Sequence, residues 1–291
     1  MKKIIFKSSF LYLFIFLLCS KVYSYDREII VSEIKNLIES NPEITDSIKS
    51  FYTGTLFEPY WRNNKTKINN LVNVLSDTYK EGIPTNRYKI QDIINLNYST
   101  KESDIAKLDI MLTEKFLLHA KDLSIGIVNP LQLSSFIEIK REDIEDIVER
   151  DFLSNLTEEI NIKKFFESLR PKNSDYLKLM IELAKLKVLK TTNADQTIVP
   201  NDITLELGMS HPNVIPLRNR LLELNILENS SKSETFDDEL LKSVLLFQEN
   251  SGLVSDGVIG KKTYQALNLS IQTKLIQVMV NLERLRWLNF D

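Results

Sequence analysis

The stretch Gly252-Leu253-Val254-Ser255-Asp256-Gly257-Val258-Ile259-Gly260 decides the fold of the last third of this chain. It holds three of the seven glycines found among 291 residues. Clustered glycines indicate backbone positions that need a positive φ or a close approach to another segment. Asp-Gly favours a tight turn, because aspartate bonds its own backbone and glycine turns in either direction. The stretch is therefore predicted to be a compact loop between helices.

Helical patterns lie on both sides of this loop. Upstream, apolar residues recur at helical spacing, as on one face of a helix; they are Val214, Leu217, Leu221 and Leu224. A second pattern ends at Phe247-Gln248, and a third begins near Thr263. We expect the three helices to bury a shared core, formed by Leu217, Leu221, Val244, Phe247 and Leu267.

Helices and loop in this order resemble the type 1 peptidoglycan-binding domain, a small helical module of cell-wall enzymes. The matching residues are Leu240, Val244, Phe247, Gln248, Gly252, Leu253, Asp256, Gly257, Gly260, Thr263 and Leu267. The resemblance implies that the loop contacts peptidoglycan, and the residues expected to do so are Gln248, Asp256, Gly257, Gly260 and Thr263. One alternative stays open: the loop only joins two core helices.

The last helical pattern, residues 270–288, closes with Asn281-Leu282-Glu283-Arg284-Leu285-Arg286-Trp287-Leu288. This run is similar to the helix that joins the binding module to the catalytic domain in the large Gram-negative L,D-transpeptidases. Scattered residues also resemble the scaffold region of that family: Phe51, Tyr52, Pro59, Trp61, Asp109, Thr113, Ala120, Asp122, Gly126, Leu169, Pro171 and Tyr176. The family's nucleophile is a cysteine, in a domain that would begin just past Asp291.

The N-terminus predicts export. A basic start is followed by an apolar run over residues 10–18 and by Val22-Tyr23-Ser24, as in a secretory signal peptide cleaved between Ser24 and Tyr25. An uncleaved membrane anchor is the alternative. Cys19 is the only cysteine, so the mature periplasmic chain would have no thiol nucleophile and no disulfide. It would carry 33 basic against 40 acidic side chains without a long basic tract, which argues against nucleic acid as a partner.

The body of the chain is predicted to be mostly α. Apolar residues follow helical spacing over 26–39, 66–80, 103–123, 141–169 and 174–190, and few stretches alternate with a period of two. A polar segment with a proline, residues 191–202, is the expected boundary. The expected domains are a signal peptide at 1–24, a helical scaffold domain at 25–195, a small three-helix peptidoglycan-binding module at 205–269, and a linker helix at 270–291 leading to a missing catalytic domain.

Few residues offer catalytic chemistry. His119 and His211 have no Ser or Cys partner that the sequence identifies, and His119 is expected at a helix surface or boundary rather than as a base. The aromatic cluster around Phe51 and Trp61 is interpreted as core packing rather than a sugar platform. An acidic cluster is interpreted as a solvated helix face rather than a metal site; its members are Glu142, Asp143, Glu145, Asp146, Glu149 and Asp151. No metal, cofactor or catalytic residue is assigned.

Together these features predict the non-catalytic scaffold and peptidoglycan-binding portion of an L,D-transpeptidase-like protein, truncated or split and associated with the cell wall. Two alternatives remain. The chain is a docking scaffold for a separately encoded catalytic polypeptide, or it is a glycan-cleaving enzyme that uses a carboxylate pair not recognisable in the sequence.

Overall fold

The computed structural model describes residues 27–62, 64–133, 142–156, 160–192, 196–229 and 231–289. These residues are mostly helical, and they contain no strand longer than an isolated bridge. The two bridges pair Leu205 with Ile259 and Ser210 with Thr235. The mostly α fold class predicted from the periodicity is confirmed. The expected signal peptide lies outside the described residues. Within them, no helix has the length and apolar character needed to cross a membrane.

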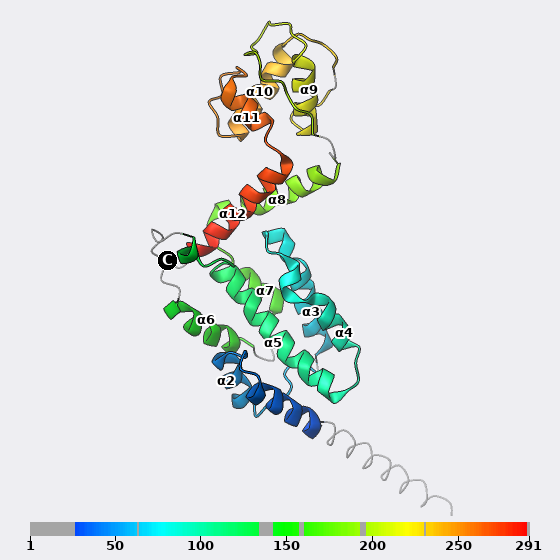
Figure 1. Cartoon of the computed structure of the whole chain (residues 1–291), viewed down its shortest axis with the longest axis vertical. Coiled ribbons are helices and arrows are strands. Elements are labelled where there is room, and N and C mark those ends of the chain that lie inside the picture. Colours follow the sequence, from blue (N-terminus) through cyan, green and yellow to red (C-terminus); the bar gives the residue numbers. More distant parts are fainter. Residues whose placement is uncertain are drawn as a thin grey trace, which may run out of the picture. The chain divides into compact units, whose positions relative to one another are not determined.

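The chain forms two compact units (Figure 1). The first consists of Met1–Asn173 together with Glu283–Asp291, and the second is Ser174–Leu282. The second unit is therefore inserted into the sequence of the first. The structure divides the chain at residue 173, ahead of helix α8, whereas the sequence favours the polar segment 191–202. The contacts that define a compact unit and the composition of the sequence can change at different residues. The domain limits expected from the sequence therefore stay predictions.

The first unit is built around the long helix α5 (Glu102–Ser124). Helices α3 (Lys65–Ser76), α4 (Ile90–Asn97) and α6 (Glu142–Ser154) pack against it. The other elements are α2 (Asp46–Gly54), α7 (Ile162–Ser168), a helix over residues 27–40 and the short 3-10 turns η1 (Thr78–Glu81), η2 (Thr85–Tyr88) and η3 (Pro130–Gln132). Aromatic rings join α5 to α7, where the buried Phe116 stacks on the partly buried Phe165 with 5.0 Å between centroids.

Capping residues explain where several of these helices begin. Thr45, Asn64 and Asn161 precede α2, α3 and α7, and each side chain accepts a backbone N–H three residues ahead. Such caps satisfy donors that the first helical turn leaves without a partner. The sequence analysis predicted one pattern over 141–169, but the chain forms α6 and α7 there, separated by residues 155–161. Helices α2 and α4 were not predicted, because each is short.

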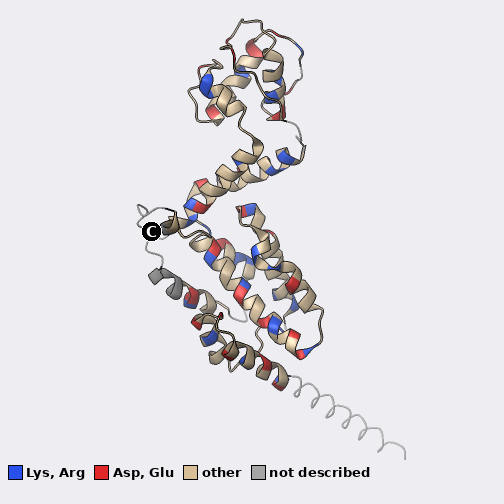
Figure 2. Cartoon of the chain, in the orientation of Figure 1, with Lys and Arg blue, Asp and Glu red and all other residues tan. Residues whose placement is uncertain are grey.

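The second unit contains α8 (Ser174–Thr192), α9 (Val214–Glu223), α10 (Asp238–Asn250), α11 (Lys261–Leu267) and most of α12 (Ile271–Trp287). Helices α9, α10 and α11 surround a separate hydrophobic core that includes all five core residues expected from the sequence. Acidic and basic residues are interspersed along the described helices of both units (Figure 2).

Burial corrects two of the sequence interpretations. His119 is not at a helix surface, since only 1% of it is exposed. Glu149 is not part of a solvated face either: it is buried and forms an ion pair with Lys121 at 2.7 Å. The side chains of residues 142–147 lie outside what the structure describes. The core interpretation of the aromatic cluster is confirmed, because Tyr52 and Trp61 are fully buried.

Candidate functional site

The glycine-rich loop is organised by one buried amide. Gln248, near the end of α10, is 1% exposed. Its Nε2 donates to Asp256 Oδ1 at 2.8 Å, to the Val258 carbonyl at 3.0 Å and to Thr263 Oγ1 at 3.3 Å. Its Oε1 accepts the Gly257 N–H at 2.8 Å. An amide side chain offers N–H donors and an acceptor oxygen at the same time, without carrying a charge. Gln248 therefore holds the loop from inside.

Asp256 fixes the turn from the solvent side. Its Oδ1 accepts the Val258 N–H at 2.9 Å as well as the Gln248 amide. The hydrogen bond from Val258, followed by that from Gln248, lowers the pKa of this exposed carboxyl below its usual value. Hydrogen bonds that favour the charged form have this effect. Asp256 is thus ionised at neutral pH and accessible to a ligand.

Two of the three glycines have the backbone that their clustering predicts. Gly252 and Gly257 have φ values of 66° and 75°. Gly257 is also buried, and an added Cβ would meet the side chain of Leu241. Gly260 differs from the expectation, since its φ is −93° and nothing lies within 4 Å of an added Cβ. It serves as the N-cap of α11, a position that also accepts other small residues.

The residues expected to contact peptidoglycan thus share one network but not one surface. Gln248, Gly257 and Thr263 are buried, Gly260 is half-buried, and Asp256 is exposed. The sequence analysis overlooked Val254, which is 79% exposed at the tip of the loop. The sequence could have indicated Val254 as a surface contact, because an aliphatic residue within a polar turn has no core to fill.

A second cluster joins the two ends of the three-helix module. Arg220 is fully buried; its Nε donates to the Leu267 carbonyl at 2.8 Å and its Nη1 pairs with Glu223 at 2.9 Å. Glu223 in turn accepts the Thr197 N–H. Asn268 bonds both backbone groups of Val199, at 2.9 Å each. Both ends of the module are therefore tied at one place. The sequence offered one sign of this cluster: Arg220 lies three residues after Leu217, on the face of the helix that is otherwise apolar.

A buried carboxylate also organises the first unit. Asp109, 1% exposed, accepts the Tyr52 hydroxyl at 2.8 Å and the backbone N–H groups of Tyr60 and Trp61 at 3.0 and 2.8 Å. Thr113 bonds the Trp61 indole at 3.0 Å. Burial raises the pKa of Asp109 to about 6 against these hydrogen bonds. A raised pKa is often a mark of a catalytic acid, but Asp109 is enclosed by its structural partners.

His119 belongs to a second enclosed chain of polar groups. Its Nδ1 lies 3.0 Å from the Tyr88 hydroxyl, which donates to Asp122 at 2.8 Å. Since the single Tyr88 proton is used there, Nδ1 of His119 carries the hydrogen that Tyr88 accepts. Arg87 completes the chain with two bonds to Asp122 at 3.0 Å. Burial, with the charges of Arg170 and Arg286, lowers the pKa of His119 to about 3.

Residues 283–287 of the run at 281–288 form a clasp within the first unit. Glu283 Oε1 accepts the N–H groups of Ile127 and Val128 at 2.6 and 2.8 Å and the Trp287 indole at 3.0 Å. Arg286, 1% exposed, pairs with Glu283 at 2.9 Å and donates to the Glu81 carbonyl at 3.1 Å. The motif thus fastens the end of α12 to the loop that follows α5.

These features define a helical scaffold that carries an inserted three-helix module with an internally bonded glycine loop. Comparison with known families agrees with this description. Residues 46–183 match the Scaffold domain, and residues 210–267 match the putative peptidoglycan binding domain. A Scaffold domain followed by a peptidoglycan-binding domain is the N-terminal architecture of the L,D-transpeptidases, and the chain has this architecture. No family model of a catalytic domain matches these residues. A search of curated proteins finds no match.

Proposed function

We propose that this chain is an exported protein that binds peptidoglycan through the α9–α11 module and holds that module on a helical scaffold. The two matched domains support a peptidoglycan-binding scaffold role. The observation that carries the proposal is the loop network around Gln248, which lies inside the matched domain and presents Val254 and Asp256 to solvent. The contact surface is then the exposed tip of the loop, and Gln248, Gly257, Gly260 and Thr263 act by shaping it.

Co-sedimentation of the full chain with purified sacculi tests this function. Val254→Asp places a charge at the loop tip without touching the core, so we expect weaker sedimentation and an unchanged melting temperature. Leu207→Asp is a matched control, because Leu207 is also exposed, at 49%, but lies outside residues 252–260. A folded wild-type chain that stays in the supernatant would reject the proposal. Equal losses in the two variants would show that the loop tip is not the contact surface.

We further propose that these residues bind and position but perform no acyl transfer. Acyl transfer by a cysteine needs a thiolate, a base and oxyanion donors. Cys19, the one cysteine, falls within the expected signal peptide. The purified chain should therefore neither cross-link muropeptides nor exchange their terminal residue. Cross-linking that persists in Cys19→Ser would contradict this part of the proposal and would require another nucleophile.

Export is part of the same proposal. The peptidoglycan-binding domain indicates association with the cell wall, and a signal peptide would deliver the chain to the periplasm. Sequencing the N-terminus of protein recovered from cells should give Tyr25 as the first residue. An intact Met1 in a cytosolic fraction would refute the assignment. A separately encoded catalytic polypeptide is the partner that such a scaffold would serve.

A further inference from the structure

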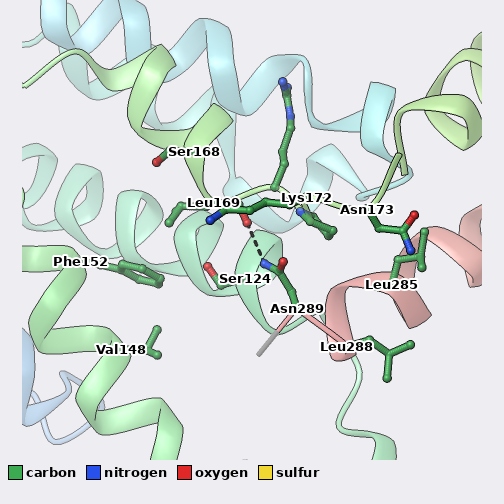
Figure 3. A pocket seen from close by; sticks show the side chains of 12 residues that line it. Ser124, Val148, Phe152, Ser168, Leu169, Lys172, Asn173, Leu285, Leu288 and Asn289 are labelled. Atoms are coloured by element: carbon green, nitrogen blue, oxygen red, sulfur yellow. Dashed lines mark hydrogen bonds between the residues drawn. The ribbon is translucent and has the colours of Figure 1, made fainter. Parts of the chain in front are cut away.

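A pocket of about 430 Å³ lies in the first unit, apart from the module. It is lined by the end of α5, by α6, by the segment after α7 and by the end of α12 (Figure 3). Its apolar walls come from Val148 and Phe152 on one side and from Leu285 and Leu288 on the other. A volume of this size is typical of sites for small ligands, which combine apolar walls with a few polar groups.

The charged side chains that line the pocket are all positive. Its lining includes two cations, Arg170 and Lys172, and none of the described residues that line it is acidic. Arg170 is engaged by Glu81 at 2.7 Å. Lys172 is exposed and has no ion partner among the residues that the structure describes. In a chain with more acidic than basic residues, this pocket therefore selects for an anionic group at its rim.

A polar amide sits beside these apolar walls. Asn289 Nδ2 donates to the Leu169 carbonyl at 3.2 Å. This bond orients the amide and leaves Oδ1 as an acceptor (Figure 3). An apolar wall, an acceptor for an N–H and a free ammonium correspond to three parts of a peptide end, which are an aliphatic side chain, a backbone N–H and a terminal carboxylate.

We propose that this pocket binds the end of a short peptide with a free carboxylate and an aliphatic side chain. The carboxylate pairs with Lys172, the peptide N–H donates to Asn289 Oδ1, and the side chain packs on the apolar wall formed by Leu285 and Leu288. The site is separate from the peptidoglycan contact proposed for the module and does not depend on it. Such a peptide end comes from a protein or from a peptidoglycan stem, and the two differ in the chirality of the last residue.

Fluorescence anisotropy on the full chain tests the proposal with a dye-labelled tripeptide, Gly-Ala-Leu, as the free acid and as the C-terminal amide. We expect the acid to bind about two- to fivefold more tightly, as an ion pair with an exposed lysine allows. A third peptide that ends in D-alanine with a free carboxylate identifies the source. Tighter binding of that peptide than of the L-leucine acid points to peptidoglycan stems, and the reverse points to a protein terminus.

Two variants locate the site. Lys172→Met should abolish the preference for the acid and leave binding of the amide unchanged. Leu288→Asp should weaken binding of both forms, because Leu288 contributes wall rather than charge and is 66% exposed. Lys163→Met is the matched control on α7, with an exposed lysine outside the pocket, and it should change nothing. Equal binding of acids and amide by the wild type, or a preference that survives Lys172→Met, would overturn the proposal.

Discussion

Gly126 is predicted to be the most sensitive glycine in the first unit. Its φ is +81°, and a Cβ added there would lie 2.5 Å from Glu283 Oε1 and 2.8 Å from two atoms of the Trp287 ring. Those neighbours are held by the clasp, since the same Glu283 oxygen accepts the Ile127 and Val128 N–H groups. An alanine at residue 126 must therefore either displace the end of α12 or distort its own loop.

The cost can be worked from these contacts. A left-handed backbone costs a residue with a Cβ about 1–2 kcal/mol. Hydrogen bonds to a charged group contribute about 1.5–3 kcal/mol each, and displacement of Glu283 weakens the two that it accepts from the loop. We expect Gly126→Ala to lower the free energy of unfolding of the first unit by about 3–5 kcal/mol, well above the value of about 1 kcal/mol that is usual for a substitution.

Tryptophan emission during urea unfolding reports on this unit alone, because both tryptophans of the chain, Trp61 and Trp287, belong to it. Gly54→Ala is the neutral control, since Gly54 has no positive φ and nothing lies within 4 Å of an added Cβ. Gly208→Ala, followed by circular dichroism, measures backbone strain alone, because its φ is +87° in open space.

The clasp itself is tested by a double-mutant cycle. In a Trp287→Ala background the added Cβ at residue 126 has lost its closest ring atoms, so Gly126→Ala should cost less there than in the wild type. Equal costs of Gly126→Ala and Gly208→Ala, with no coupling to Trp287, would refute the reasoning, because the clasp would then add nothing to the strain of the backbone.

Three further predictions follow from burial. Gln248→Ala should release the loop and cost about 1–3 kcal/mol through the polar groups left without a partner, whereas the exposed Gln265→Ala should be neutral in the same thermal melt. Phe247→Ala should cost about 3–5 kcal/mol by leaving a cavity, and a cooperative melt at the wild-type temperature would contradict this. His119 has a folded pKa of about 3 against an ordinary 6.5, so its contribution to stability is present above pH 6.5 and is lost as the pH falls toward 3. Asp109 has the opposite effect on stability. Because its pKa is raised to about 6 in the folded state, it stabilises the fold increasingly as the pH falls from 6 to 4. As the pH falls below 6.5, the wild type should therefore lose about 1.4 kcal/mol per pH unit more than His119→Asn does, and parallel stability–pH curves would exclude a buried neutral histidine.

The sequence by itself determined the local features of this protein. Helical spacing of apolar residues predicted the α class, the core positions Leu217 and Leu221 and the long helices, because periodicity reports which face of a helix is buried. The Asp-Gly turn predicted the loop, since turn chemistry depends on a few adjacent residues. Resemblance to the peptidoglycan-binding domain further indicated Gln248 and Asp256. It assigned both to ligand contact and did not indicate that Gln248 holds the loop from inside.

Only the tertiary structure decided which of these side chains face inward. Whether Gln248 binds a ligand or holds a loop depends on what covers it, and helical spacing does not distinguish a buried His119 or Arg220 from an exposed one. Likewise, the run at 281–288 was recognisable as a motif, but the hydrogen bonds of its Glu283 with Ile127 and Val128 join segments that lie more than 150 residues apart. No local pattern encodes such a pairing, because it exists only once the intervening chain has folded and brought the two segments together.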